Sequence, residues 1–320
     1  MSELTVQQPK IPGQIPNIAV LLATHDGLRW LPEQLATILG QHAVNVTVWV
    51  SDDASSDGTW EWLQEQSKLE PRLKILPKAG VFGSAARNFY RLVCDADWQG
   101  ADFVAFADQD DIWLPEKLGL HSSLMEQRGL TAISSNVTAF WPDGRTALID
   151  KAQPQRDWDY IFGSAGPGCT YLMRPGLMTQ LKMLLLDERS AARQCALHDW
   201  LVYAVCRATG GTWYIDPSPS VHYRQHGKNE FGANVGIRQI LRRLGKTYGG
   251  WHRQEAYKIA SSVSPLITDR NRQEELSGLR SALMAKGFGA RLCLLKFAAS
   301  GRRKLADRLA LGFLIASGVW

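Results

Sequence analysis

Three carboxylates crowd into four residues where a short apolar run ends. The run Phe103–Ala107 contains no Gly or Pro and is typical of a strand covered on both faces. Asp108, Asp110 and Asp111 follow it. Burying mutually repelling carboxylates costs free energy unless a cation or strong hydrogen-bond donors compensate their charge. The spacing predicts a divalent-metal site at the carboxyl end of a buried strand, with an acidic turn as the alternative.

Polar side chains also follow two earlier apolar runs. Ile18–Ala23 leads into residues 24–26, and Val44–Val50 leads into residues 51–53. Ligands of open α/β sheets bind at the carboxyl ends of strands, so a nucleotide is expected there. No GxGxxG follows the first run and no GxxxxGK[ST] occurs in the chain. A dinucleotide-binding enzyme and a P-loop enzyme are therefore disfavoured.

The elements that must position these residues alternate in type. The predicted strands are Ile18–Ala23, Val44–Val50, Leu73–Leu76 and Phe103–Ala107. The predicted helices cover Leu31 to Leu39, Thr59–Leu69 and Gly83–Val93, and a fourth helix is expected to begin at Pro115. Strands that alternate with helices indicate a parallel, doubly wound α/β sheet.

The second half has a different pattern. Thr131–Phe140 predicts one strand, and Asp143-Gly144 predicts a hairpin turn after it. Residues 150–163 are expected to form a variable connection, and Gly166–Met173 a Gly-rich loop that enters a strand. An apolar helix follows, opened by a His and an Asp at 198–199.

Composition describes an ordinary globular protein of one large or two modest domains. The chain has 320 residues, 45% hydrophobic and 21% charged. Its five cysteines are scattered and never occur as CxxC, which fits a reducing compartment and disfavours a disulfide framework or a zinc site. The N-terminal 16 residues lack an apolar signal core, so export is not expected.

Charge is unevenly distributed. Residues 236–320 hold 16 of the 36 Lys and Arg but only 5 of the 31 Asp and Glu, a net charge of +11 against −6 for the remainder. Such a basic tail suggests a polyanionic neighbour, which could be membrane phospholipid, a phosphorylated lipid or nucleic acid.

Three motifs in register resemble one family. LLATHDG, VSDDASSDGT and FADQDDIWLPEKL, in this order, are similar to the nucleotide-binding half of the family 2 glycosyltransferases, which adopt the GT-A fold. The resemblance covers roughly residues 17–235. QDDIW and the later YRQHGKN are similar to bacterial rhamnosyltransferases that use dTDP-rhamnose. The implied fold class is a GT-A type, doubly wound, mostly parallel sheet with a C-terminal basic helical extension.

The resemblance implies a metal and its ligands. In the DxD motif of the family, the first Asp reaches the ribose or the metal and the last binds the metal, so these roles fall on Asp108 and Asp110. A hard cation, Mg²⁺ or Mn²⁺, neutralises the departing diphosphate. His226 is the expected third ligand.

The resemblance also implies nucleotide contacts. Thr24 and His25 lie in the first motif, with His25 in place of a base-stacking Tyr. Asp53 resembles the residue that accepts the N3–H of uracil or thymine, which favours UDP or dTDP. Arg87 reaches a phosphate or forms an ion pair on a helix surface. Arg224 belongs to a loop, with Lys228 and Asn229, that could cover the diphosphate.

Six further side chains are expected near the sugar and the acceptor: Asp111, Trp113, Cys169, Thr170, His198 and Trp200. Asp111 either supports a ligand or faces the sugar. Trp113 and Trp200 either present flat faces to a sugar or belong to the core. Cys169 is not expected to be a nucleophile, because no partner base is evident.

Asp199 matches the general base of the family. An inverting transfer needs one carboxylate opposite the diphosphate, to take the proton of the acceptor hydroxyl as that oxygen attacks C1. His198 stands where Glu is more usual. The alternative for Asp199 is a simple helix cap.

The basic tail is expected to be helical. Apolar residues recur at helical spacing within 237–244, followed by apolar runs at 292–297 and 309–320, each too short for the roughly 20 residues that span a bilayer. One interpretation is a helical packing domain with solvated basic faces. The other is a peripheral anchor on an anionic membrane, with Trp251 and Trp320 at the interface.

These expectations define the hypothesis. The predicted parts are a loose arm (1–16), a nucleotide-sugar-binding half (17–130), an acceptor and catalytic half (131–235) and a basic helical extension (236–320). The expected enzyme is inverting and metal-dependent, and it transfers L-rhamnose from dTDP-rhamnose, or a sugar from another UDP- or dTDP-sugar. The expected acceptor is a bacterial surface glycan, in lipopolysaccharide or a lipid-linked polysaccharide. We expect a cytoplasmic location, with peripheral contact to the inner face of the plasma membrane and no nucleic-acid partner.

Two rival functions are weighed against it. A nucleotidyltransferase should show a Gly- and Lys-rich phosphate loop after the first strand, and THDGLRW has none. A catalytically silent nucleotide-binding module would have no need to keep Asp108, Asp110 and Asp199 together.

Overall fold

The computed structural model describes residues 14–226 and 250–320. The elements up to residue 130 are β1 (Asn17–Thr24), α1 (Leu31–Leu39), β2 (Asn45–Asp52), α2 (Thr59–Leu69), β3 (Leu73–Ile75), α3 (Ala85–Asp95), β4 (Phe103–Ala107), β5 (Ile112–Trp113) and α4 (Lys117–Arg128). The four predicted strands and the helices between them are confirmed to within two residues. Helix α4 begins two residues after Pro115, with Glu116 as its N-cap residue.

The second part of the chain adds strands to the same sheet. Its elements are β6 (Ala132–Ser135), β7 (Val137–Phe140), β8 (Thr146–Ile149), α5 (Asp159–Phe162), β9 (Leu172–Met173), α6 (Pro175–Leu186), α7 (His198–Ala208), β10 (Trp213–Asp216) and β11 (Val221–Arg224). The large sheet has the order β10-β6-β9-β4-β1-β2-β3. Strands β1, β2, β3 and β4 are parallel, and β9 is antiparallel to both of its neighbours. The expected mostly parallel α/β sheet is confirmed.

A smaller sheet corrects one expectation. The single strand predicted over Thr131–Phe140 is wrong, because the chain leaves the large sheet at Asn136 and enters a four-stranded sheet of order β5-β11-β7-β8. The buried Asn136 side chain donates to the carbonyl of Pro217 at 2.9 Å and accepts from the amide of Lys151 at 2.6 Å. The predicted hairpin after β7 is confirmed, since β7 and β8 pair antiparallel.

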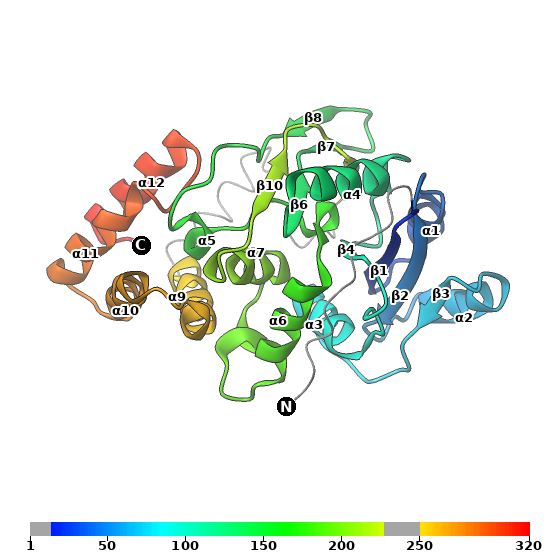
Figure 1. Cartoon of the computed structure of the whole chain (residues 1–320), viewed down its shortest axis with the longest axis horizontal. Coiled ribbons are helices and arrows are strands. Elements are labelled where there is room, and N and C mark those ends of the chain that lie inside the picture. The colour runs from blue at the N-terminus through cyan, green and yellow to red at the C-terminus, as the bar shows by residue number, and fades with distance from the viewer. Residues whose placement is uncertain (1–13, 227–249) are drawn as a thin grey trace.

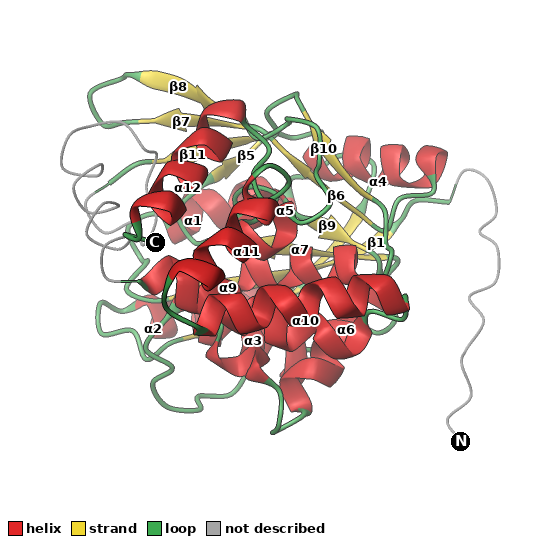
Figure 2. Cartoon of the chain, turned by 90° about the vertical axis from the view of Figure 1, so that its left-hand side faces the viewer, coloured by secondary structure: helices red, strands yellow, loops and turns green. Residues whose placement is uncertain are grey.

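Two apolar clusters cover the two faces of the large sheet. Alternate residues of β1 point to opposite faces. Ile18, Val20 and Leu22 pack with the buried residues of α1, α2 and α4, whereas Ala19 and Leu21 pack with those of α3, α6, α7 and α9. Figure 2 shows α3, α6, α9 and α10 grouped on one side of this sheet. The helices hold the strands so that their carboxyl ends stay open.

Four helices follow the second gap in the description. They are α9 (Trp251–Val263), α10 (Arg270–Met284), α11 (Phe288–Ala298) and α12 (Leu305–Ser317). Helix α9 packs on α5 and α7, and α10 to α12 lie at the end of the molecule opposite α1 and α2 (Figure 1). Within residues 14–226 and 250–320, no helix combines the length and the apolar character needed to cross a bilayer.

Several expectations concern residues outside this description. They are residues 1–13 of the expected arm, Lys228 and Asn229 of the loop that could cover the diphosphate, and the amphipathic segment 237–246. For these residues the expectations remain predictions.

Candidate active site

A cavity of about 1230 Å³ opens at the carboxyl ends of the parallel strands. The register pairs Thr24 with Asp52 across β1 and β2, and Leu22 with Ala107 across β1 and β4. Residues that follow these three strands therefore emerge at one edge of the sheet. Those that line the cavity are Thr24, His25, Asp26, Asp53, Asp108, Gln109 and Asp110.

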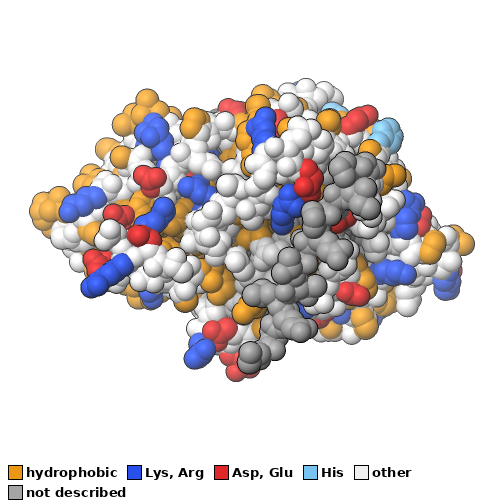
Figure 3. Space-filling view, in the orientation of Figure 1, with side chains coloured by type: hydrophobic (Ala, Val, Ile, Leu, Met, Phe, Trp, Pro, Cys, Tyr) orange, Lys and Arg blue, Asp and Glu red, His pale blue; other side chains and the backbone are white. Residues whose placement is uncertain are grey.

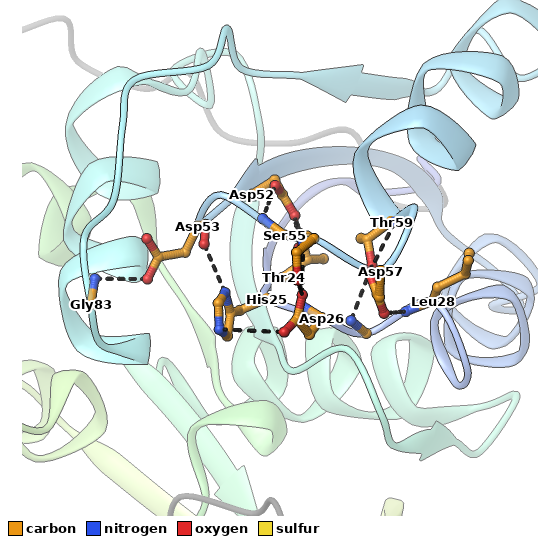
Figure 4. Close-up of polar contacts among 12 residues, drawn as sticks. Thr24, His25, Asp26, Leu28, Asp52, Asp53, Ser55, Asp57, Thr59 and Gly83 are labelled. Atoms are coloured by element: carbon orange, nitrogen blue, oxygen red, sulfur yellow. Dashed lines mark hydrogen bonds and ion pairs between the residues drawn. The ribbon is translucent and has the colours of Figure 1, made fainter.

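The acidic residues at and after the end of β2 make different hydrogen bonds (Figure 4). Asp52 accepts from the Thr24 hydroxyl at 2.9 Å and from the Ser55 amide at 2.9 Å. Asp57 accepts from the Leu28 amide at 3.0 Å. These two carboxylates tie the loops after β1 and β2 together, which leaves Asp53 to face the cavity.

Asp53 organises the wall on its side of the cavity. Its carboxylate accepts from the backbone amides of Phe82 and Gly83, the latter at 2.8 Å (Figure 4). Its backbone carbonyl accepts from Nδ1 of His25 at 2.7 Å, so the proton of that ring lies on Nδ1. The His25 side chain is 61% exposed and lies at the rim of the cavity. A flat aromatic ring at this point could stack on a planar ligand.

Asp110 contacts His226 in the cavity. Its Oδ2 lies 2.6 Å from Nε2 of His226. The His226 ring is stacked on Trp30, with centroids 4.1 Å apart and planes at 16°. Arg224 lies behind the acidic turn, where its Nε donates to the carbonyl of Asp110 at 2.8 Å and its Nη2 reaches Glu33 at 2.5 Å. Arg224 thus supports the backbone of Asp110 and does not itself line the cavity.

Asp111 lies on the other side of the same turn. It is fully buried and accepts from the amide of Arg224 at 3.2 Å. Burial, together with the charges of Asp110 and Asp108, raises the pKa of Asp111 well above its usual value. Burial likewise raises the pKa of the neighbouring Cys169 thiol. Asp111 is buried outside the cavity lining, which favours the alternative in which it supports a ligand over the one in which it faces the sugar.

The oxygen-rich face of the turn fits a hard cation. Asp108 and Asp110 both line the cavity, and carboxylate oxygens with an imidazole nearby suit Mg²⁺ or Mn²⁺. A second grouping, Asp108, Asp111 and Cys169, has ligand atoms within 4.8 Å of one another. Its two buried members, Asp111 and Cys169, lie outside the cavity lining. The cavity-facing pair fits a cation better.

Asp199 enters the cavity from the first turn of α7. Leu197 is the N-cap residue of that helix and makes no capping bond through its side chain, so Asp199 is not an N-cap. Its Oδ1 accepts from the amide of Trp200 at 2.7 Å. Burial raises the pKa of Asp199 to about 6, while bonds from the Trp200 amide and the Ser164 hydroxyl and the charge of Lys151 act in the opposite direction. A carboxylate with this pKa can exchange a proton near neutral pH.

His198 is held beside it as a neutral ring. It stacks on Phe89, with centroids 3.8 Å apart. Burial lowers the pKa of His198 to about 3. A Cβ at position 168 would lie 2.6 Å from Nε2 of His198, so Gly168 leaves the room that the ring occupies. Within the described part of the chain, that Nε2 has no hydrogen-bond partner.

Other expected site residues lie outside the cavity. Trp113 is buried in the core with Nζ of Lys117 3.4 Å from its ring centroid, so the core alternative holds for Trp113. Cys169 and Thr170 are buried behind the wall, and only their neighbours at 166–168 line the cavity. Arg87 is exposed and also lies outside the lining. Contact between these side chains and a ligand is thus not supported.

Trp200 combines both alternatives. It lines the cavity, yet its side chain is buried and its Nε1 donates to the carbonyl of Tyr160 at 2.8 Å. Trp200 is therefore a core residue that also forms part of the cavity wall.

Several lining residues were missed by sequence reasoning. Gln109 donates to the carbonyl of His25 and accepts from its amide, both at 2.8 Å, which clamps the ends of β1 and β4 together. Trp30, Lys151 and Ser164 line the cavity without any motif that would have identified them. Arg302, Arg303 and Lys304 of the basic tail also line the cavity, a position that neither interpretation of the tail had predicted.

The chain is similar to known glycosyltransferases. The family model for glycosyl transferase family 2 matches residues 19–175. The dTDP-rhamnosyl transferase RfbG of Shigella flexneri is 36% identical over 289 residues, which cover 90% of this chain and 96% of that protein. The UDP-Glc:alpha-D-GlcNAc-diphosphoundecaprenol beta-1,3-glucosyltransferase WfgD of Escherichia coli is 25% identical over 155 residues, 48% of this chain and 57% of that protein.

Solved structures show the same fold. S. aureus TarS 1-349, in complex with UDP-GlcNAc, superposes with a TM-score of 0.60 at 13% identity and covers 95% of this chain and 88% of that chain. The mannosyltransferase PcManGT of Pyrobaculum calidifontis, in complex with GDP-Man and Mn²⁺, has a TM-score of 0.50 at 16% identity, covering 97% and 88%. The shared architecture is the GT-A fold.

Proposed function

The chain belongs to the family 2 glycosyltransferases, and from this premise we propose that it is an inverting, metal-dependent rhamnosyltransferase. Its donor is dTDP-L-rhamnose and its acceptor is a hydroxyl of a bacterial surface glycan. The donor assignment is supported by the similarity to RfbG, which extends over 90% of the chain. The acceptor class is supported by WfgD, whose named acceptor is a sugar on diphosphoundecaprenol.

One observation carries the catalytic proposal. Asp108 and Asp110 at the end of β4, and Asp199 at the start of α7, line the same cavity although they are about 90 residues apart in the chain. A single displacement needs a site for the leaving diphosphate and a base for the acceptor within one space. The cavity contains residues suited to both.

Asp199 is the proposed general base. Its carboxylate takes the proton of the acceptor hydroxyl while that oxygen attacks C1 of the sugar from the face opposite the diphosphate. The C1–O bond to the diphosphate breaks as the new bond forms, so the configuration at C1 inverts. His198 remains neutral beside it because of its lowered pKa, so it does not compete for this proton.

Asp108 and Asp110 are the proposed metal ligands, with His226 as the third. When bound, Mg²⁺ or Mn²⁺ neutralises charge on the departing diphosphate. His226 already lies within 2.6 Å of Asp110, and Trp30 holds its ring in place.

Asp53, His25 and Thr24 are proposed to bind the nucleotide. Each carboxylate oxygen of Asp53 can accept a second hydrogen bond beyond those from Phe82 and Gly83, so Asp53 can still accept a hydrogen bond from the N3–H of a pyrimidine. His25 offers its exposed ring to the base. These contacts select a pyrimidine nucleotide and leave the sugar to other parts of the cavity.

A thermal-shift panel tests the donor. We expect dTDP-rhamnose with Mn²⁺ to raise the melting temperature, because a ligand that binds only the folded state stabilises it; at a hundredfold excess over Kd the gain is about 2.7 kcal/mol. UDP-glucose, UDP-GlcNAc and GDP-mannose serve as comparisons. A larger shift with a UDP-sugar would replace the donor assignment. A shift with dTDP but turnover with none of the sugars would instead support the silent module.

The raised pKa of Asp199 predicts the pH dependence of transfer. A base must be deprotonated, so kcat/KM for the acceptor should fall about tenfold per pH unit below the pKa, which burial raises to about 6, and level off above it. The measurement is a profile between about pH 5 and pH 9 at saturating donor and Mn²⁺. If kcat/KM did not fall on the acidic side of the profile, Asp199 would not be the base.

We further propose peripheral contact with the anionic inner face of the bacterial plasma membrane. The supporting feature is a set of apolar side chains on α11 and α12 that are 48–74% exposed: Phe288, Leu292, Leu305, Leu309 and Phe313. Figure 3 shows apolar side chains interspersed with Lys and Arg at this end of the molecule. Trp320 is not among them, because it is buried against Phe162, which corrects its expected place at the interface.

A further inference from the structure

The segment between α11 and α12 packs closely on α5. The amide of Trp158 donates to the carbonyl of Ser300 at 3.3 Å. A Cβ at Gly301 would lie 2.7 Å from Cδ2 of Phe162, so the close approach of the two backbones depends on a glycine at this position. The basic helical extension is therefore fastened to the catalytic half just before α12 begins.

Arg303 makes the polar part of this contact. Its Nη1 lies 3.3 Å from Oδ2 of Asp159, and its Nη2 donates to the carbonyl of Ser164 at 2.9 Å and to that of Ala165 at 3.4 Å. The Arg303 side chain is only 10% exposed. Asp159 also pairs with Arg207 at 3.0 Å, so the charge of Asp159 is compensated by more than one arginine. The bonds to the two carbonyls are the contribution that Arg303 alone makes.

The loop that Arg303 holds, residues 163–168, forms the cavity wall beside Asp199. Residues 163, 164 and 166–168 line the cavity together with His198 and Asp199. A Cβ at Gly168 would lie 3.3 Å from Cβ of Asp199 and 2.6 Å from Nε2 of His198. The loop is therefore packed against both side chains, and a shift of the loop would move the surroundings of Asp199.

Ser164 connects Arg303 to Asp199 directly. Its hydroxyl lies 3.2 Å from the carbonyl of Gly166, and it also hydrogen-bonds Asp199, where it lowers the pKa of the carboxyl against the effect of burial. A hydroxyl can rotate toward a carboxylate when that group is charged. The carbonyl of the same residue accepts from Arg303, so one residue contacts both groups.

Other titratable groups also face Asp199. The charge of Lys151 lowers the pKa of Asp199, as the Ser164 hydroxyl does. His198 is neutral because burial lowers its pKa to about 3. Burial raises the pKa of Tyr90 and of Tyr171 well above the usual value, so both phenols stay neutral as well. Lys151 and Ser164 are thus the side chains that favour the charged form of Asp199.

We propose that Arg303 is a positioning residue for transfer: by holding the backbone of Ser164 and Ala165, it keeps the loop 163–168 where the Ser164 hydroxyl supports Asp199. The inference rests on the proposed function, since Asp199 is the proposed base. It gives the basic helical extension a part in the active site, which neither packing on the core nor contact with a membrane includes.

The pH profile of Arg303→Gln tests this role. At saturating dTDP-rhamnose and Mn²⁺ we expect kcat to fall about 10–100-fold, because the base is displaced, while the donor still raises the melting temperature as in the wild type. The acidic fall of kcat/KM should move to higher pH by about one unit. Its direction follows from the lost hydrogen bond, since a carboxyl with a higher pKa stays protonated to a higher pH.

Paired variants show whether the effect passes through Ser164. Ser164→Ala should move the acidic fall in the same direction, and Arg303→Gln/Ser164→Ala should move it no further than the larger single change. Additive displacements would mean that Arg303 acts on Asp199 by another route, and they would overturn the proposal. Arg303→Lys keeps the charge near Asp159 but lacks the planar fork that serves two sides at once, so an intermediate kcat is expected.

A matched control separates this role from loss of charge in the extension. Arg270 on α10 is 89% exposed, so Arg270→Gln should keep the wild-type kcat and pH profile. A wild-type profile and kcat in Arg303→Gln overturns the proposal. If that variant folds too poorly to assay, Arg303→Lys and Ser164→Ala decide, and a wild-type acidic fall in Ser164→Ala overturns the proposal equally.

The titration of Asp199 can also be followed without turnover. In aspartate-labelled protein, the NMR signal of its carboxyl carbon is the one that Asp199→Asn lacks. If no nucleotide sugar is transferred but Arg303→Gln raises the midpoint of this titration, the proposed function fails while the link from Arg303 to Asp199 is supported. If the wild type transfers rhamnose and Arg303→Gln leaves the midpoint unchanged, the positioning role alone is rejected.

Discussion

Replacing Asp199 by asparagine is expected to lower kcat by about 10²–10⁴-fold while leaving donor binding intact, the range for loss of a general base. The asparagine side chain keeps the volume of the aspartate and can still accept the hydrogen bond that the backbone N–H of Trp200 makes at 2.7 Å, but it cannot take a proton. Because burial already disfavours the charged carboxyl, the neutral amide should not lower the melting temperature. Single-turnover kinetics with saturating dTDP-rhamnose and Mn²⁺ measure the effect.

The controls for this variant separate chemistry from folding. Asp157→Asn makes the same chemical change at an exposed position of the same half and should retain full activity. Asp199→Asn should also lose the acidic limb of the pH profile. If Asp199→Asn instead abolished the thermal shift given by the donor, the residue would belong to the donor site and another group would have to be the base.

Replacing Asp110 by asparagine is expected to remove both Mn²⁺-dependent donor binding and transfer. The variant loses a carboxylate oxygen in the cavity and alters the contact with His226, whose nitrogen lies 2.6 Å away. Transfer should fall by about 10²–10³-fold or more, the size seen when a group that stabilises developing charge is removed. Thermal shifts with dTDP-rhamnose, with and without Mn²⁺, and steady-state rates provide the two measurements.

The exposed residue Asp97 supplies the matched control for this variant, as Asp97→Asn. That variant should keep the Mn²⁺-dependent shift. An Asp110→Asn protein with a normal Mn²⁺-dependent shift and normal rates would reject the acidic turn as the metal site. The cation would then have to be sought elsewhere, or the acidic turn would be structural after all.

The two variants are expected to differ in kind. Asp110 acts on the donor and its leaving group, so its loss should appear in binding as well as rate. Asp199 acts on the acceptor, so its loss should appear in the rate alone. A protein that merely bound nucleotides would show the first effect without any activity to lose in the second.

The sequence by itself determined the architecture of the first half. Apolar runs such as Ile18–Ala23 and Phe103–Ala107 are buried on both faces, and this local signal is strong because a parallel sheet is covered by helices on each side. The polar residues after each run lie at one sheet edge because parallel strands all end on the same side. The sequence alone therefore predicts that Asp53, Asp108 and Asp110 lie at this edge.

Asp199 was found from sequence for a different reason. Its prediction rested on resemblance to a family motif and on the chemistry of sugar transfer, since a lone Asp near a helix start is also a plausible cap. The tertiary structure excludes the N-cap position, which Leu197 holds, and brings the carboxylate to the cavity.

Tertiary structure alone decided which neighbours of the motif residues face the cavity. Asp110 and Asp111 are adjacent in sequence, yet the bend that follows β4 places one in the cavity lining and buries the other near Cys169. The break at Asn136 and the approach of Arg302 to the catalytic half depend on contacts between segments far apart in the chain. Local patterns carry no information on such contacts, since packing and burial are properties of the assembled fold.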